Sequence, residues 1–252
     1  MEKQQKNVLI TGAGKRIGRS IALKLAGEGW NIAIHYRHSL EEAKSLQSEV
    51  NALGCVACLL QADLAKPDDV RRLFKQAKDE LGILTGLINN ASLFEPDELG
   101  NLTDESFQAH LETNLHAPLI LTEQLAKQED IKAIGGHIVN IVDQRVLNLR
   151  PDFMSYTLSK AALWTLTQTS AMDLAPYIRV NAIGPGPTLP NSRQSQAAFD
   201  RQLAGVPLKR GATPEEIAEG VLFLINSNSI TGEFIAMDGG QHLPISTARE
   251  EY

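Results

Sequence analysis

Several features that mark other protein classes are missing from this sequence. No apolar run approaches the ~20 residues that would span a bilayer, and the opening residues M-E-K-Q-Q-K-N lack the apolar stretch of a signal peptide. The formal net charge of -6 argues against a general nucleic-acid binder, because such proteins usually carry a basic patch. We find no internal repeat, low-complexity tract or interdomain linker. These absences favour one cytoplasmic domain, residues 1–252, with one core.

Cysteine is almost absent as well. The only two, Cys55 and Cys58, form a C-x-x-C, a spacing that invites a redox or metal interpretation. They fall in an apolar run that reads as a strand, where residues three apart point to opposite faces. A zinc site would need two further ligands, and the six histidines show no paired motif. We therefore expect two buried structural thiols and no metal.

The residues that are present alternate between short apolar runs and helical patterns. The runs at 7–11, 31–36, 55–62, 84–89, 137–142, 177–183 and 233–238 are expected to be strands. Helices are expected over 40–53, from Pro67 through Leu81, over about 104–127, from the Tyr156 region to about Ala175, and from the Thr213 cap. This alternation predicts an α/β fold with a parallel, doubly wound sheet.

The first strand leads into a glycine turn, G-A-G-K-R-I-G, and then into a helical pattern. Glycines at 12, 14 and 18 allow the backbone to approach a ligand closely, and the start of the helix offers free N–H groups to a phosphate. Such a turn also occurs merely as a tight turn. Its place after the first strand of a βαβ unit favours dinucleotide binding.

The end of the second strand bears on which dinucleotide binds. Proteins that prefer NAD usually place an Asp or Glu here for the ribose 2′-hydroxyl, and none appears before Glu41. Arg37, together with Arg16 from the glycine turn and the Ser39 hydroxyl, offers charge-assisted hydrogen bonds to a 2′-phosphate. The sequence therefore favours NADP over NAD. For His38 alone, a solvated basic turn is an open alternative.

Three side chains between Val142 and Lys160 are suited to proton chemistry. Tyr156 and Lys160 are four residues apart in a helix-forming segment, so both should project from one face, and the ammonium would lower the phenol's pKa. Asp143 follows an apolar run, at the strand end where ligands bind in open α/β sheets, and would raise that pKa. Tyr-x-x-x-Lys also occurs by chance, and Asp at a strand end is also a common turn former.

Two further segments invite a functional interpretation. Small polar residues in N-A-S-L-F, after the fourth strand, suit a backbone that passes close under a ligand, and Asn114 lies within the following helix. Asn114 is of interest only if it points toward Lys160, since most such residues face solvent. The prolines and glycines of G-P-G-P-T-L-P indicate irregular structure, and the polar, unpatterned residues after them predict a substrate flap over 188–212.

With T-G-A-G-K-R-I-G, N-N-A-S, Y-T-L-S-K and G-P-G in this order, the chain resembles the short-chain dehydrogenase/reductase family over nearly its full length. The resemblance implies a seven-stranded Rossmann-type sheet in three layers, a nicotinamide dinucleotide, and frequently a homotetramer. It implies that Tyr156 transfers the proton, that Lys160 holds the nicotinamide ribose, and that Asn114 supports a water relay. The residues it implies at the cofactor are Gly12, Arg16, Ile17, Tyr36, Arg37, His38, Ser39, Asp63, Leu64, Asn90, Ala91, Ser92, Lys160, Pro185 and Gly186.

Two departures from the common family pattern are Arg16 in place of a third glycine and Asp143 in place of a serine. With H-Y-R-H-S and N-A-S-L-F, they resemble the pteridine reductase branch, which includes dihydromonapterin reductase-like enzymes. That resemblance implies that Phe94 stacks on a pterin ring and that Arg16 and Ser92 contact substrate and cofactor phosphates. Asp143 and Tyr156 complete the expected substrate contacts.

The chemistry of Asp143 favours the same branch. Carbonyl reduction builds negative charge on oxygen, which a carboxylate would oppose, whereas a protonated C=N bond would be stabilised by it. The sequence thus predicts an NADPH-dependent reductase of a dihydropterin-type C=N bond. A carbonyl reductase of a 3-oxoacyl thioester, sugar or quinone is the alternative, followed by a non-catalytic NADP-sensing protein. The polar tail either frays or reaches a neighbouring subunit.

Overall fold

The computed structural model describes residues 6–190 and 193–244. Its centre is a parallel sheet with the strand order β3-β2-β1-β4-β5-β6-β7. The strands are β1 (Asn7–Ile10), β2 (Asn31–Tyr36), β3 (Ala57–Gln61), β4 (Gly86–Asn89), β5 (Gly136–Ile141), β6 (Ile178–Pro185) and β7 (Phe234–Met237). The expected seven-stranded, doubly wound Rossmann-type sheet in a single domain is thereby confirmed.

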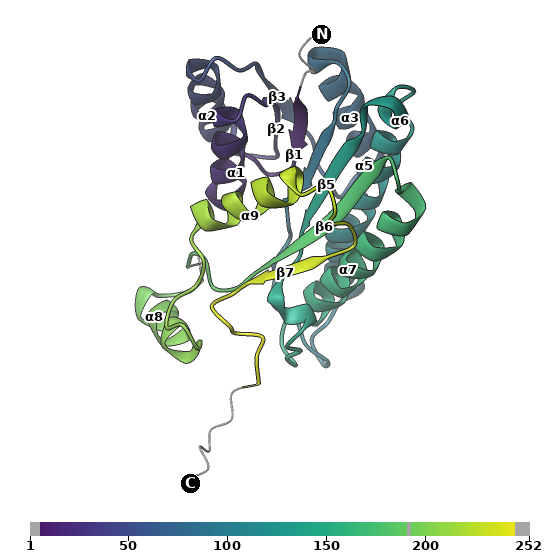
Figure 1. Cartoon of the computed structure of the whole chain (residues 1–252). Coiled ribbons are helices and arrows are strands. Elements are labelled where there is room, and N and C mark those ends of the chain that lie inside the picture. Colours follow the sequence, from purple (N-terminus) through teal and green to yellow (C-terminus); the bar gives the residue numbers. More distant parts are fainter. Residues whose placement is uncertain (1–5, 191–192, 245–252) are drawn as a thin grey trace.

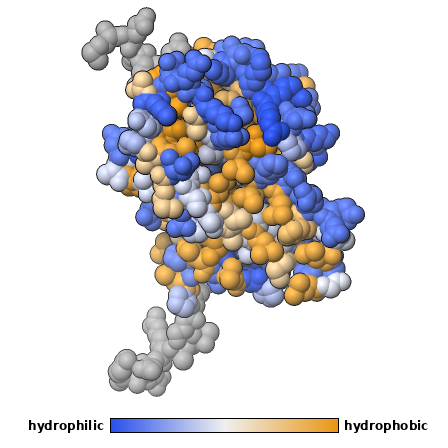
Figure 2. Space-filling model, turned by 90° about the vertical axis from the view of Figure 1, so that its right-hand side faces the viewer, coloured by the Kyte–Doolittle hydropathy of each residue, from blue (hydrophilic) through white to orange (hydrophobic). Residues whose placement is uncertain are grey.

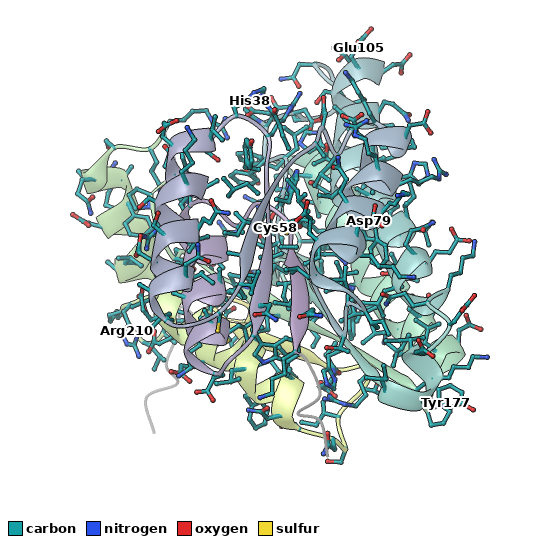
Figure 3. All side chains as sticks on the ribbon, turned by 90° about the horizontal axis from the view of Figure 1, so that it is seen from above. His38, Cys58, Asp79, Glu105, Tyr177 and Arg210 are labelled. Atoms are coloured by element: carbon teal, nitrogen blue, oxygen red, sulfur yellow. The ribbon has the colours of Figure 1, made fainter. Side chains whose placement is uncertain are left out.

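Helices cover both faces of this sheet (Figures 1 and 3). They are α1 (Arg16–Gly27), α2 (Leu40–Ala52), α3 (Pro67–Leu81), α4 (Asp104–Leu111), α5 (Ala117–Ala126), α6 (Ile131–Ile134), α7 (Met154–Leu174), α8 (Gln196–Gly205) and α9 (Pro214–Asn226). A π-helical turn, η1 (Glu112–His116), joins α4 to α5, and a 3-10 turn, η2 (Gln144–Val146), follows β5. In the described residues, no helix is both long and apolar enough to cross a membrane.

The alternation of side chains along the strands divides the core into two layers. In β1, Val8 and Ile10 pack with α1, α2 and α9, whereas Leu9 between them packs with α3, α5 and the far end of α7. Successive strand residues point to opposite faces, so a strand covered on both sides must be apolar throughout. This explains the continuous apolar runs in the sequence.

Besides shifts of one or two residues at strand ends, the structure differs from the sequence-based expectations in four features. The G-P-G segment is not wholly irregular, because β6 continues through Pro185. The helix expected over about 104–127 contains the η1 π turn. The polar flap contains α8, which begins at the Ser195 cap, although residues 191 and 192 lie outside the described part. The fourth difference concerns the cysteines: Cys55 precedes β3, and both thiols are only half-buried.

Sheet order places the functional segments together. β1 and β4 are neighbours, although the chain runs outward from β1 to β3 before returning to β4. The loops after these two strands therefore lie side by side at the carboxyl edge, at the point where the strand order reverses. The polar tail, residues 245–252, lies outside the described residues.

Candidate active site

The glycine turn after β1 is tightly confined. Gly12 has a φ of +64°, and a Cβ there would lie 3.1 Å from the Ala91 backbone. A Cβ on Gly18, in the first turn of α1, would collide with the carbonyl oxygen of Gly12. Both positions therefore require glycine, and the start of α1 stays close to the strand, as a phosphate-binding turn demands.

Side chains from neighbouring strands hold this turn in place. The Asn90 amide donates to the carbonyls of Thr11 (2.9 Å) and Gly12 (3.1 Å). The Gly12 N–H donates to Nδ1 of His35 (3.0 Å), and burial lowers the pKa of His35 to about 4. A neutral imidazole whose Nδ1 accepts must carry its proton on Nε2, which contacts the Ala62 carbonyl at 3.2 Å. The sequence analysis missed His35 because its partners lie in the segments that follow β1 and β3, far from it in the sequence.

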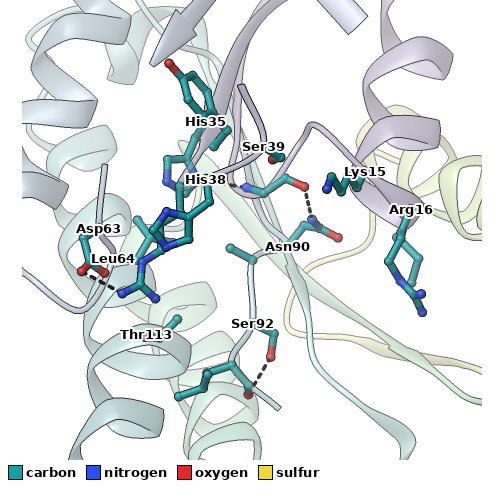
Figure 4. Close-up of a pocket in the computed structure, with 17 residues that line it drawn as sticks. Lys15, Arg16, His35, His38, Ser39, Asp63, Leu64, Asn90, Ser92 and Thr113 are labelled. Carbon is teal, nitrogen blue, oxygen red and sulfur yellow. Dashed lines mark hydrogen bonds and ion pairs between the residues drawn. The ribbon is translucent and has the colours of Figure 1, made fainter. Parts of the chain in front are cut away.

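A cavity of about 530 Å³ opens beside the glycine turn (Figure 4). Twelve of the residues expected at the cofactor line it: Gly12, Arg16, Ile17, Tyr36, Arg37, His38, Ser39, Asp63, Leu64, Asn90, Ala91 and Ser92. Lys160, Pro185 and Gly186 line a second cavity, which shares Arg16, Ile17, Asn90 and Ser92 with the first. The two cavities together form one cleft along the carboxyl edge of the sheet.

The three polar groups expected at a 2′-phosphate do not all meet. Arg37 pairs with Asp63 (3.1 Å), and a Cβ on Gly14 would lie 3.2 Å from the Ser39 hydroxyl. Arg16 points away from them, and its guanidinium donates to the carbonyls of Pro190 (2.8 Å) and Leu189 (3.1 Å) (Figure 4). All three line the first cavity, but backbone oxygens from beyond β6 hold the Arg16 guanidinium apart from Arg37 and Ser39 in this structure.

Asp143 and Tyr156 meet in the second cavity. The Tyr156 hydroxyl donates to Oδ2 of Asp143 at 2.7 Å, and Oδ1 of Asp143 accepts from the Arg145 N–H at 2.8 Å. The carboxylate caps the η2 turn, which fixes its orientation. Asp143 therefore forms the turn and also contacts Tyr156, so the two roles considered for it are compatible.

Burial and Asp143 together control the protonation of Tyr156. Burial first, and then the Asp143 charge and hydrogen bond, raise the pKa of Tyr156 well above its ordinary value. The net direction is thus opposite to the lowering expected from Lys160 and the same as the raising expected from Asp143. Burial also raises the pKa of Asp143. Tyr156 thus keeps its proton.

Lys160 lies beneath this pair, fully buried. Its Nζ donates to the Ile141 carbonyl at 2.8 Å and lies 5.8 Å from the centroid of the Tyr156 ring. Burial lowers the pKa of Lys160 to about 8, against the attraction of Asp143. The Lys160 ammonium is thus fixed by a hydrogen bond to the last residue of β5.

Asn114 positions the loop that follows β4. Its amide nitrogen donates to the Leu93 carbonyl (2.9 Å) and to the Ser159 hydroxyl (3.0 Å), and its Oδ1 accepts the Leu93 N–H (2.8 Å). The side chain is thus directed at Ser159, the residue before Lys160, and not at Lys160 itself. It does not line either cavity of the cleft.

Two aromatic rings border the Asp143–Tyr156 pair. Phe94 lies parallel to Phe153, with centroids 4.2 Å apart, and its ring meets Tyr156 edge-on at 4.6 Å. Phe153, which the sequence analysis missed, has a φ of 57°, a conformation uncommon for a non-glycine residue. No sequence signal marks such a backbone angle.

The residues expected to contact substrate all line the second cavity, which measures about 510 Å³. They are Arg16, Ser92, Phe94, Asp143 and Tyr156. Thr188, Leu189, Gln194 and Phe199 of the expected flap line it too. Within residues 6–190 and 193–244, no group of His, Cys, Asp or Glu could hold a metal ion. The C-x-x-C pair carries no such site, and burial raises the pKa of Cys58 to about 12.

Chemically, the cleft combines a confined backbone turn with a protonated phenol held by a carboxylate. The glycine turn suits a phosphate, and the phenol can give its proton to an atom bound in the second cavity. Lys160 would stabilise the phenolate that remains. A ligand spanning both cavities would bring a redox-active ring next to Tyr156.

Comparisons with known proteins agree with this arrangement. The family described as enoyl-(acyl carrier protein) reductase matches residues 12–242. The 3-oxoacyl-[acyl-carrier-protein] reductase FabG of Staphylococcus epidermidis is 32% identical over 243 residues, which cover 94% of this chain and 99% of the relative. The uncharacterized oxidoreductase YgfF of Escherichia coli is 32% identical over 92% of this chain and 98% of its own. The chain belongs to the short-chain dehydrogenase/reductase family and is an oxidoreductase of that family.

Solved structures give a more specific likeness. FolM alternative dihydrofolate reductase 1 from Brucella suis, in complex with NADP, matches with a TM-score of 0.92 and 46% identity, covering 96% of this chain and 97% of that one. A blue fluorescent protein from a metagenomic library, in complex with NADPH, matches with a TM-score of 0.85 and 31% identity over 93% of this chain and 97% of its own.

Proposed function

We propose that this member of the short-chain dehydrogenase/reductase family is an NADPH-dependent reductase of a dihydropterin-type C=N bond. One observation carries the proposal: the Tyr156 hydroxyl donates a 2.7 Å hydrogen bond to the Asp143 carboxylate. A carboxylate at this place opposes the negative charge that develops on oxygen when a carbonyl is reduced. The same carboxylate stabilises a protonated C=N group, which is cationic.

The cleft fits the cofactor that the proposal requires. Gly12 and Gly18 leave no room for a side chain where the backbone must approach a pyrophosphate, and Arg37 offers a cation at the end of β2. NADPH, when bound, supplies the hydride that adds to the substrate's ring carbon. The NADP and NADPH bound in the solved relatives support this assignment.

The chain's own residues supply the proton. Tyr156 holds its proton at neutral pH and donates it to the ring nitrogen, so that C=N becomes CH–NH. Lys160 stabilises the resulting phenolate, which regains its proton through Asp143, at hydrogen-bond distance, so that one proton from the solvent is consumed for each C=N bond reduced. Phe94, Arg16 and Ser92 line the same cavity, where Phe94 would stack on the substrate ring by displacing the Phe153 or Arg193 side chain that now packs on it, and Arg16 and Ser92 would contact substrate and cofactor phosphates.

A carbonyl reductase is the second candidate. The FabG relatives favour it, at 32% identity over nearly the full chain. The FolM structures are closer, at 46% identity, and they support a pterin-like substrate. The two candidates differ in the effect expected of the carboxylate at position 143.

A substrate panel tests the proposal. NADPH oxidation is measured with 7,8-dihydropterins, dihydrofolate, a 3-oxoacyl thioester and a simple ketone, for the parent protein and for Asp143→Ser. We expect the parent to turn over the dihydropterins, and Asp143→Ser to lose about a hundredfold or more of that rate. Full dihydropterin activity in Asp143→Ser would refute the role of Asp143. Turnover of ketones alone would establish the carbonyl reductase.

We also propose that residues 188–212 close over the substrate and that the protein is a homotetramer. Arg16 ties the start of this segment to the glycine turn, and α8 borders the cleft.

On the side of the molecule where α5 and α7 lie, hydrophobic residues gather toward the centre and the lower half of the surface (Figure 2). Leu119, Leu158 and Met172 are exposed on these helices, which suits a subunit interface.

A further inference from the structure

A third cavity, of about 390 Å³, continues from the cavity of Asp143 and Tyr156. It lies between α8, the loop before Phe153 and the segment that follows β7. Three residues, Arg150, Gln202 and Gln241, line both cavities. Because these residues line both, the third cavity lies directly beside the cavity of Asp143 and Tyr156.

The third cavity carries positive charge only. Arg150 and Arg201 line it, and the other described lining residues are apolar or carry uncharged amides. Other arginines of the cleft are engaged: Arg145 pairs with Asp152 at 2.9 Å, and Arg193 with Glu95 at 2.6 Å. Within the described residues, Arg150 and Arg201 have neither an ion pair nor a hydrogen bond. Asp152, the carboxylate whose pKa Arg150 helps to lower, is held mainly by Arg145.

Amide side chains line the path from the catalytic pair to these arginines. Gln144, next to Asp143, is 5% exposed, and its buried Oε1 has no hydrogen-bond partner among the described residues. Gln202 accepts from Gln194 at 2.9 Å, and Gln241, also buried, accepts at its backbone carbonyl from Asn148. A buried acceptor without a partner is costly, so a ligand that donates a hydrogen bond to Gln144 would gain from it.

We infer that the substrate of this site carries an anionic arm, a carboxylate or a phosphate, which Arg150 and Arg201 bind in the third cavity. The inference rests on the proposed function, because it places the reacting ring beside Tyr156 and extends the same molecule outward. Arg150 and Arg201 both line this cavity and are exposed to solvent, and guanidinium groups match the geometry of both carboxylate and phosphate. The arm contributes binding energy and takes no part in the chemical step.

Steady-state kinetics with three kinds of dihydropterin test this inference. One has an uncharged side chain (7,8-dihydrobiopterin), one has carboxylates (dihydrofolate) and one has a phosphate (7,8-dihydroneopterin monophosphate). They are compared in the parent, in Arg150→Gln, in Arg201→Gln and in the double variant. Arg71→Gln, which removes one charge from an exposed position on α3, as each single variant removes one from the cavity, is the matched control for the single variants.

We expect the double variant to raise KM for an anionic substrate by about tenfold, with kcat unchanged and KM for the uncharged substrate within about twofold. Added salt should raise KM for the anionic substrate in the parent and have little effect in the double variant. If only dihydrofolate responds, the arm is a carboxylate. If only the phosphate ester responds, the arm is a phosphate.

Two results would overturn the inference while leaving the proposed function intact. One is that the double variant reduces all three substrates and that its KM changes by the same factor for each of them. The other is a KM change for the anionic substrates in Arg150→Gln and in Arg201→Gln that is no larger than the change in Arg71→Gln. Turnover of the uncharged substrate shows that each variant is folded. If the parent reduces no dihydropterin at all, the proposed function itself fails.

Discussion

The hydroxyl of Tyr156 donates its hydrogen bond to Oδ2 of Asp143 over 2.7 Å, although thirteen residues separate the two along the chain. Asp143 ends the loop after β5 and Tyr156 lies in the first turns of α7, so the contact joins a strand end to a helix start. The carboxylate and burial both keep the phenol protonated. The pair is therefore arranged to give a proton rather than to remove one.

Replacing Tyr156 with Phe removes the donated proton and leaves the ring in place. We expect kcat for dihydropterin reduction to fall by about a hundredfold or more. NADPH affinity, followed by the cofactor's fluorescence, should change little, because the first cavity is lined by other residues. Retained turnover in Tyr156→Phe would mean that another group supplies the proton.

The rate should fall in alkaline solution because Lys160 loses its charge. Burial lowers the Lys160 pKa to about 8, so the ammonium that stabilises a Tyr156 phenolate disappears as the pH rises through that value. A profile of kcat/KM between pH 6 and about 9.5 should therefore show a descending limb near pH 8. In Lys160→Met the rate should be lower throughout and this limb should be absent. A limb that persists in Lys160→Met would assign it to another group.

His35 should make the protein less stable in acid. Its pKa falls from 6.5 to about 4 on folding, so between these values the unfolded chain binds a proton that the folded chain does not. The stabilisation is complete above pH 6.5 and is lost as the pH falls through 4, by about 3 kcal/mol in total. Urea unfolding at a series of pH values measures this loss. In acid, the loss of unfolding free energy should be smaller in His35→Gln than in the parent, by the amount that His35 contributes. His137, whose pKa is also lowered to about 4, serves as the comparison.

Arg37 should distinguish NADPH from NADH. Arg37 is the arginine that lies at the end of β2, because the backbone carbonyls of Leu189 and Pro190 hold Arg16 away from it. We expect Arg37→Gln to raise KM for NADPH by about tenfold and to leave KM for NADH nearly unchanged, because only NADPH carries the 2′-phosphate. Equal changes for the two cofactors would place the 2′-phosphate elsewhere.

The apolar surface of α7 should govern assembly. Met172 is 74% exposed on α7, and Leu99, 81% exposed in a loop, offers a matched control. We expect Met172→Lys to reduce the molar mass in solution from that of a tetramer, because a charge would be buried at the interface. Light scattering after size-exclusion chromatography measures this. Leu99→Lys should keep the parent's mass, and an equal mass in both variants would exclude α7 from the interface.

The fold could be read from the sequence because its signals are local. Strand and helix periodicities, the glycine turn and the Thr213 cap each depend on residues a few positions apart, and the structure has these elements at nearly the expected places. The cavity-lining residues of the glycine turn and of the loops after β2 and β4 follow from the same reasoning, because parallel strands bring their carboxyl ends to one edge. The likeness to NADP-bound relatives agrees with the expected cofactor.

Tertiary structure decided several contacts that no residue pattern predicts. His35 reaches Gly12, Arg16 reaches a carbonyl 174 residues away, and Phe153 stacks on Phe94 through a backbone angle that no residue pattern announces. The pKa of Tyr156 was settled in the same way, because burial, which no sequence pattern measures, acts in the same direction as Asp143 and outweighs any effect of Lys160. Periodicity fixes which face of a strand or helix is buried, whereas the partner of a long polar side chain depends on distances that only the folded chain defines.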